Sequence, residues 1–163
     1  VRTNRQGAEI QTALREAGVG VAKVTLHVGT GTFEPVRVDA LDEHVMHHER
    51  YRVPHQTAAA IAATGGLGGR VVAVGTTVVR TLEAWSREGR PADGAWRTTD
   101  LFLRPGEPFE VVEGMITNFH LPRSTLLVLV AAWLGREPAL AIYRRAVASG
   151  YRFYSYGDAM LLL

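Results

Sequence analysis

The 163-residue sequence contains no cysteine, and Lys23 is its only lysine. Without cysteine the chain forms no disulfide and offers zinc no thiolate, a composition that fits a reducing cytoplasm, where we expect the protein. The longest apolar run, residues 126–134, is much shorter than the roughly 20 residues that span a bilayer, so we expect no membrane segment. The first residues lack an initial Met and the apolar stretch of a signal peptide, which predicts a processed chain or a fragment.

Composition indicates a globular protein with a core of its own. Hydrophobic residues make up 47% of the chain and charged residues 21%, which excludes disordered and fibrous classes. The net charge of +2 is too small to indicate nucleic-acid binding by itself. Nearly all basic residues are arginine. This bias has two possible explanations, bidentate binding of phosphate or a genome rich in G and C.

Helical and strand periodicity alternate along the chain. The expected helices are residues 6–17, 55–63, 76–88, 122–134 and 139–148, and the expected strands are residues 21–28, 70–75, 100–103, 109–112, 115–117 and 159–163. This alternation predicts a single α/β domain over residues 1–163 with a mainly parallel sheet.

The first candidate site follows the strand at residues 21–28. His27 lies on the polar face of that strand, and the loop Gly29, Thr30, Gly31 and Thr32 comes directly after it. Backbone N–H groups of such a loop can approach a substrate closely, with His27 pointing to the same place. The alternative interpretation is a glycine hairpin with a structural histidine.

The second candidate is rich in histidine. His44 and His48 are four residues apart and Glu49 adds a carboxylate, so we considered a metal site. No His-Glu-x-x-His pattern is present, and we therefore favour a polar surface or substrate-contact segment without a metal.

The third candidate is a strand that turns through Gly75 into a helix. The unpaired N–H groups at the start of that helix, with the hydroxyls of Thr76 and Thr77 and with Arg80 one turn further on, form a potential anion site. The glycine spacing and lysine of a Walker loop are missing. An ordinary capped helix is the alternative.

The fourth candidate joins two separate segments. Asn118 and His120 follow a strand, where α/β folds place ligands, and Tyr154, Tyr156 and Asp158 precede the last strand. The tyrosines can stack on bases or face a cation, and Asp158 can act as a general base or hold a ribose. The alternative is an aromatic-rich core edge with a capping asparagine.

Together these segments resemble the S-adenosylmethionine:tRNA ribosyltransferase-isomerase family, which forms epoxyqueuosine. The collinear stretches that carry the resemblance are residues 25–33, 35–38, 46–51, 74–83, 101–106, 116–127 and 151–160. Residues 21–163 resemble the C-terminal half of the family, whereas residues 1–20 match poorly, and Arg123 stands where lysine is more usual. The resemblance implies an incomplete α/β barrel-like domain that lacks the family's N-terminal half with its inserted all-β domain.

The resemblance also implies a reaction. The ribosyl group of S-adenosylmethionine moves to the amine of 7-aminomethyl-7-deazaguanine in tRNA and rearranges, which releases adenine and methionine without a metal. The sulfonium acidifies the C5′ proton, so a general base is needed, and His120 or His27 is the candidate. Asp158 would orient a histidine or bind ribose.

The remaining roles follow from the same chemistry. The methionine carboxylate or an RNA phosphate would be held by Thr76, Thr77 and Arg80. Bases would stack on Tyr154 and Tyr156, and RNA phosphates would contact Arg123 and Arg152. Two other classes stay open: an inactive RNA-binding remnant, and a different α/β enzyme that binds a phosphorylated ligand at Gly75, Thr76 and Thr77.

Overall fold

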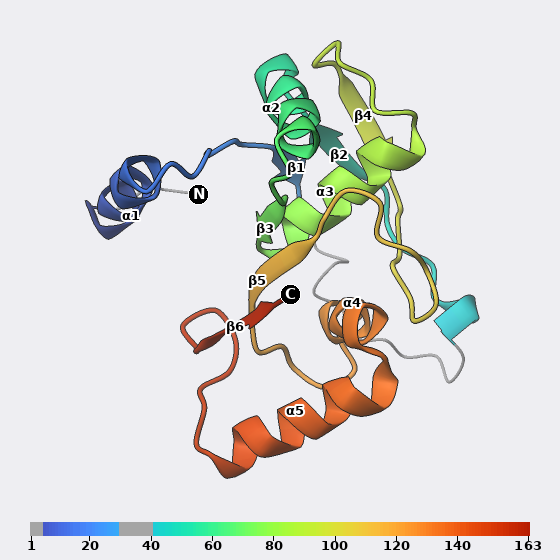
Figure 1. The fold of residues 1–163 in the computed structure, drawn as a ribbon. Coiled ribbons are helices and arrows are strands. Elements are labelled where there is room, and N and C mark those ends of the chain that lie inside the picture. The colour runs from blue at the N-terminus through green and yellow to red at the C-terminus, as the bar shows by residue number, and fades with distance from the viewer. Residues whose placement is uncertain (1–4, 30–40) are drawn as a thin grey trace.

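A computed structural model describes residues 5–29 and 41–163 of the chain. The helices are α1 (Arg5–Glu16), α2 (His55–Gly66), α3 (Thr76–Arg87), α4 (Thr125–Leu134) and α5 (Arg136–Ala148), with a short 3-10 helix, η2, at Leu41–Glu43. The strands are β1 (Thr25–His27), β2 (Glu49–Arg52), β3 (Val72–Val74), β4 (Trp96–Thr99), β5 (Gly114–Asn118) and β6 (Ala159–Leu162). The expected mixture of helices and strands is therefore present, and Figure 1 shows its arrangement.

The described strands form two three-stranded sheets. One sheet has the order β1-β2-β4 with both pairings antiparallel, and the other has the order β3-β5-β6, in which β3 and β5 are parallel and β5 and β6 antiparallel. The mainly parallel sheet that we expected is therefore wrong for this part of the chain, and these strands do not close into a barrel.

The error has a physical reason. Helices and strands do alternate in sequence, but β4 pairs with β2 instead of joining β3, so only β3 and β5 retain the parallel crossover. Strand β2 alternates buried Glu49 and Tyr51 with exposed Arg50 and Arg52. That alternation is typical of an antiparallel sheet with one face open to water.

Helix α3 packs against both sheets. It contacts β1 of the first sheet and β3 and β5 of the second, and Figure 1 shows it between them. Val79, Leu82 and Trp85 lie on its buried side, with exposed fractions of 3% or less. The spacing of these residues matches a helical face that enters a core.

Helices α4 and α5 lie beside the second sheet. Ser124 caps α4, because its Oγ accepts a hydrogen bond from the amide of Leu127, so α4 begins three residues after the expected Pro122. Gly135, with φ +85°, separates α4 from α5. No single helix in the described ranges is both long and apolar enough to cross a membrane, and the one pair that passes such a test together, α4 and α5, is bent by 115°.

Glu83 attaches the loop before β5 to α3. This carboxylate is fully buried and accepts hydrogen bonds from three consecutive amides, those of Glu110 (2.7 Å), Val111 (3.1 Å) and Val112 (2.9 Å). These bonds satisfy backbone groups that would otherwise be buried without partners, so residues 109–112 are an irregular segment and not the strand we expected.

We predict that Glu83→Gln lowers the free energy of unfolding by about 3 kcal/mol, because the new amide nitrogen would face backbone donors. Urea unfolding followed by circular dichroism measures the loss. Glu137→Gln is the matched control, since the Glu137 side chain is 70% exposed and pairs with neighbouring Arg136; its cost should stay below about 1 kcal/mol. Equal effects of the two substitutions would contradict the role of Glu83.

Candidate functional site

Segments distant in sequence meet at one edge of the β3-β5-β6 sheet. Because β3 and β5 are parallel, their carboxyl ends lie together, and Gly75 N–H donates to Ile116 O at 2.8 Å. Strand β6 runs the opposite way, so Asp158, just before it, lies beside Asn118 at the end of β5. This edge thus brings together the third and fourth candidate segments of the sequence.

The start of α3 presents backbone donors to this edge. Gly75 has φ +97°, which directs the chain from β3 into the helix and suits glycine. Thr76 is 8% exposed, Thr77 is half-buried, and neither amide donates to another described residue. Free amides at a helix start carry partial positive charge and attract anionic or polar groups.

Asp158 closes the aromatic turn, which we define as residues 152–158. Its carboxylate accepts from the Arg152 amide at 2.7 Å and from the Arg152 guanidinium at 3.2 Å. The hydrogen bond from that amide, followed by the guanidinium, lowers the pKa of Asp158, so the carboxylate is ionised near neutrality. Asp158 thus shapes the turn in addition to facing the sheet edge.

The aromatic turn is joined to β5 by further hydrogen bonds. The Asn118 side chain donates to Gly157 O (3.4 Å) and Asp158 O (3.3 Å), and the Tyr154 amide donates to Phe119 O at 2.9 Å. A Cβ at Gly157 would overlap the backbone of Arg152, so glycine is required there. Asn118 is therefore a link to the turn, whatever else it binds.

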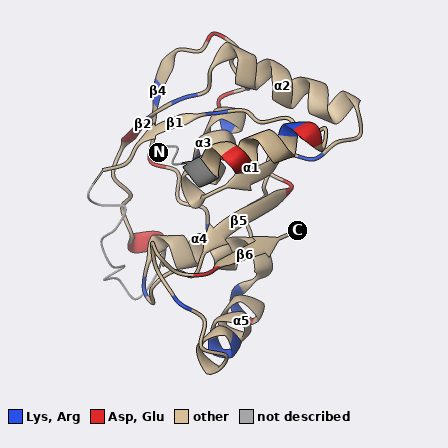
Figure 2. Ribbon diagram, turned by 90° about the vertical axis from the view of Figure 1, so that its left-hand side faces the viewer, with Lys and Arg blue, Asp and Glu red and all other residues tan. Residues whose placement is uncertain are grey.

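The side chains we assigned to RNA are exposed. Tyr154 is 52% and Tyr156 96% exposed, the Arg152 side chain is 75% exposed, and Arg123 is exposed at φ +56°. Figure 2 shows basic and acidic residues interspersed over the ribbon in that view. These four side chains are thus accessible to a macromolecule without forming a broad basic face.

His120 lies below the surface. It is 9% exposed, its Nε2 is 3.0 Å from Thr117 Oγ1, and its amide donates to Tyr143 Oη at 3.0 Å. Burial lowers the pKa of His120 to about 4, because a desolvated imidazolium is costly. The lowered pKa makes His120 the less suitable of the two candidate histidines for proton exchange near neutrality.

His27 lies on the other sheet and is exposed. Its ring meets Trp96 edge-on, with ring centroids 4.7 Å apart, and the Arg50 guanidinium carbon lies 5.2 Å from the Trp96 ring centroid. The structure therefore places the two histidines in different surroundings, one buried and neutral and the other open to solvent.

Glu49 connects the two parts of the site. Its Oε1 accepts from the Gly29 amide at 2.8 Å, and its Oε2 accepts from Arg80 Nη1 at 2.6 Å. Both side chains are buried, with 0% and 5% exposed, and Arg80 Nε also donates to Leu101 O. Arg80 is therefore linked to Gly29 through Glu49 and does not lie at a surface open to RNA.

The role of Glu49 was not evident from the sequence, where the residue counted only as a potential metal ligand. Its alternation with exposed Arg50 on a short strand was the available signal. Thr30, Gly31 and Thr32 lie outside the described residues. His44 packs against Phe102, with ring centroids 5.1 Å apart, and the described part of the chain groups no three histidine, aspartate or glutamate side chains as metal ligands would be.

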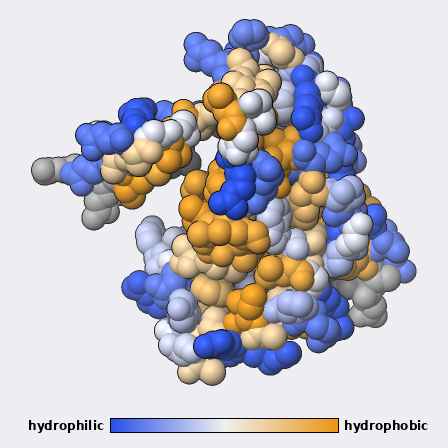
Figure 3. Space-filling model, in the orientation of Figure 1, coloured by the Kyte–Doolittle hydropathy of each residue, from blue (hydrophilic) through white to orange (hydrophobic). Residues whose placement is uncertain are grey.

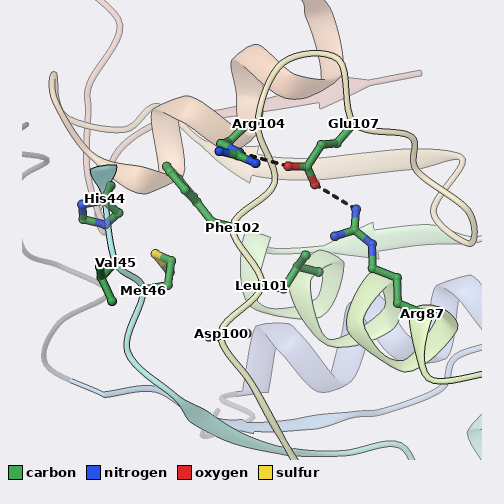
Figure 4. A pocket seen from close by; sticks show the side chains of 9 residues that line it. All are labelled: His44, Val45, Met46, Arg87, Asp100, Leu101, Phe102, Arg104 and Glu107. Carbon is green, nitrogen blue, oxygen red and sulfur yellow. Dashed lines mark hydrogen bonds and ion pairs between the residues drawn. The ribbon is translucent and has the colours of Figure 1, made fainter. Parts of the chain in front are cut away.

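A separate pocket of about 370 Å³ is lined by His44 of the second candidate segment and by none of the residues assigned to the reaction. Figure 4 shows it between the segment around His44 and the segment that follows β4. Its lining consists of His44, Val45, Met46, Arg87, Asp100, Leu101, Phe102, Arg104 and Glu107. Arg87 and Arg104 both form ion pairs with Glu107, so these three charged side chains of the lining are paired with one another.

Comparison with known proteins identifies the family. A family model described as queuosine biosynthesis protein matches residues 7–162. The S-adenosylmethionine:tRNA ribosyltransferase-isomerase of Anaeromyxobacter dehalogenans (strain 2CP-1) is 62% identical over 150 residues, which are 92% of this chain and 43% of that protein. The protein of the same name from Trichlorobacter lovleyi is 51% identical over 155 residues, which are 95% of this chain and 46% of that protein.

A solved structure agrees. The crystal structure of S-adenosylmethionine tRNA ribosyltransferase from Thermotoga maritima is similar with a TM-score of 0.74 at 43% identity, over 95% of this chain and 49% of that one. The chain belongs to the queuosine biosynthesis protein family. It corresponds to the C-terminal half of these proteins and spans about half the length of the curated relatives it matches.

We predict that Arg80→Met lowers the free energy of unfolding by about 3–5 kcal/mol, because it leaves the Glu49 carboxylate buried without its cation. Urea unfolding of Arg80→Met, Glu49→Leu and the double variant forms a cycle that measures the coupling. The free energy of unfolding of the double variant should fall by less than the sum of the decreases in the two single variants. Additive losses would contradict the pairing.

We further predict that acid destabilises the protein through His120. Its folded-state pKa of about 4 lies below the ordinary 6.5, so between these values the unfolded chain takes up the proton and folded His120 does not. The free energy of unfolding should fall by about 2–3 kcal/mol from pH 7 to pH 4 through this group. Urea unfolding at several pH values should show a flatter dependence for His120→Gln, and parallel curves would refute the prediction.

Proposed function

We propose that this chain is the catalytic C-terminal half of an enzyme that transfers the ribosyl group of S-adenosylmethionine to 7-aminomethyl-7-deazaguanine in tRNA. Rearrangement of the transferred group gives epoxyqueuosine and releases adenine and methionine. The observation that carries the proposal is the meeting of the Thr76 and Thr77 amides, Asn118 and Asp158 at one sheet edge. The relatives' printed names support S-adenosylmethionine and tRNA as substrates.

Helix α3 brings the two parts of the candidate site, the Gly29 side and the Thr76 side, into one region. Arg80 is four residues after Thr76, slightly more than one helical turn and roughly 6 Å along the axis. Because Glu49 ties Gly29 to Arg80, the end of β1 lies close to the start of α3. A substrate at the helix start would therefore be close to Gly29, and the free amides suit its methionine carboxylate.

We assign proton transfer to His27. The His27 imidazole is open to solvent, whereas His120 is buried and its pKa is lowered to about 4. His120 then serves as a neutral hydrogen-bonding group beside Thr117. Asp158 orients the aromatic turn, on which Tyr154 and Tyr156 would stack an unpaired base while Arg123 and Arg152 contact RNA phosphates.

The test uses this chain preceded by the N-terminal half of the Anaeromyxobacter dehalogenans relative. Adenine release from S-adenosylmethionine is followed by chromatography with tRNA that carries 7-aminomethyl-7-deazaguanine, and the tRNA nucleosides are analysed by mass spectrometry. We expect adenine and epoxyqueuosine in equal amounts. Binding of tRNA without adenine release would instead support an RNA-binding remnant, and binding of phosphate compounds alone a different enzyme.

His27→Ala should lower kcat by about 10²-fold or more. His55→Ala is the matched control, since His55 is an exposed histidine at the start of α2, and it should leave kcat unchanged. His120→Gln, which keeps a polar group beside Thr117, should retain kcat within about tenfold. A loss of about 10²-fold in His120→Gln with an unchanged His27→Ala would reverse the assignment.

A further inference from the structure

The β3-β5-β6 sheet is largely apolar on both faces, with Thr117 as a buried polar residue on the inner one. Its inner face, with Ala73, Met115, Met160 and Leu162, is buried in the core, with exposed fractions of 9% or less. Successive residues of a strand point to opposite sides. The residues between them therefore form a second face, which we call the outer sheet face.

The outer sheet face consists of Val72, Val74, Ile116, Leu161 and Leu163, with exposed fractions of 42%, 67%, 36%, 57% and 67%. Val74 is paired with Ile116, and Ile116 with Leu161, so the face runs across all three strands. Figure 3 shows a hydrophobic surface in the middle of the molecule, over these strands as placed in Figure 1.

Gly114 makes this face continuous. A Cβ there would lie 3.3 Å from the Val72 side chain and 3.1 Å from the Leu163 side chain, so both side chains close over the glycine. No charged residue belongs to the outer sheet face. Strands that are apolar on both sides are typical of sheets covered on both sides, and a contiguous exposed apolar surface marks an interface.

The length of the relatives indicates what covers this face. The chain accounts for 43–49% of the matched proteins and corresponds to their C-terminal half, so the partner half precedes it. That half would join at α1, which projects from the body in Figure 1 and has Ile10 and Leu14 exposed at 61% and 37%. Two uncovered apolar surfaces therefore lie where the other half would meet this one.

We propose that the outer sheet face is the docking surface for the N-terminal half of the family's protein. The half would cover Val74, Ile116 and Leu161 with apolar side chains of its own. Burial of this face excludes water from the sheet whose edge carries Asn118 and the start of α3. The docking does not depend on the assigned reaction, and its test measures no activity.

Thiol labelling tests the proposal, because the chain contains no cysteine. Val74→Cys places a single thiol on the outer sheet face, and Val147→Cys is the matched control on α5, since Val74 and Val147 are 67% and 66% exposed. Each variant is labelled with a thiol reagent alone and with the N-terminal half of the Anaeromyxobacter dehalogenans relative fused in front, its own cysteines replaced by alanine.

In the chain alone, the two thiols should react at similar rates. In the fusion, the thiol at position 74 should react more slowly by about tenfold or more, while the thiol at position 147 keeps its rate. Equal rates at both positions in the fusion would overturn the proposal. Protection of position 74 in the chain alone that grows with protein concentration would also overturn it, and would assign the face to a second copy.

A second measurement uses charge and separate chains. The N-terminal half is co-expressed with this chain, and the complex is isolated by size-exclusion chromatography with light scattering. Val74→Asp should weaken a one-to-one complex by about 10²-fold, because a carboxylate would be buried unpaired, whereas Val147→Asp should not. A complex that tolerates Val74→Asp as well as Val147→Asp would place the N-terminal half elsewhere.

Discussion

Two buried charges on adjacent turns of α3 hold the described part of the chain together. Arg80 bonds to Glu49 on β2, and Glu83, three residues later, accepts the amides that precede β5. One helix therefore forms charged contacts with elements of both sheets. Removing either partner would leave a buried charge unpaired, which costs several kcal/mol of stability. Packing of apolar side chains such as Val79 and Leu82 is not directional. The hydrogen bonds of the two charged side chains are directional, so they determine which elements α3 contacts.

The same helix determines the geometry of the candidate site. Its first turn presents the amides of Thr76 and Thr77, and its second turn carries Arg80, which supports Gly29 through Glu49. A shift of α3 would therefore move both groups of ligand-facing atoms together. The buried ion pair thus links the start of α3 to Gly29, a positional role that does not require the pair to add much net stability.

The sequence allowed much of the helical structure to be predicted. Helices α1, α3 and α5 lie within about three residues of the expected ranges, because their apolar spacing and glycine stops are local signals. Strands β2 and β4 were missed. Buried Glu49 is paired with Arg80, which lies 31 residues away in the chain, and no local pattern reveals that partner.

The strand predicted at residues 109–112 is absent because a distant side chain replaces the expected strand partner. Val111 and Val112 are buried, but Glu83 accepts hydrogen bonds from their amides, so no neighbouring strand is needed. The gathering of Gly75, Asn118 and Asp158 at a sheet edge follows from their places at strand ends and was predictable. The burial of His120 was not, since it depends on packing beneath Tyr143.

Glu83 also bears on the selectivity of the fold for anions. Three consecutive amides that converge on one point form a concave nest of the kind that holds phosphate or sulfate in other proteins. Here the chain fills that nest with its own carboxylate, so dissolved anions find no place there. The amides of Thr76 and Thr77 receive no such internal counterpart within the described residues. Of these two groups of amides, only the pair at the beginning of α3 is therefore left open to a negatively charged group from outside the described chain.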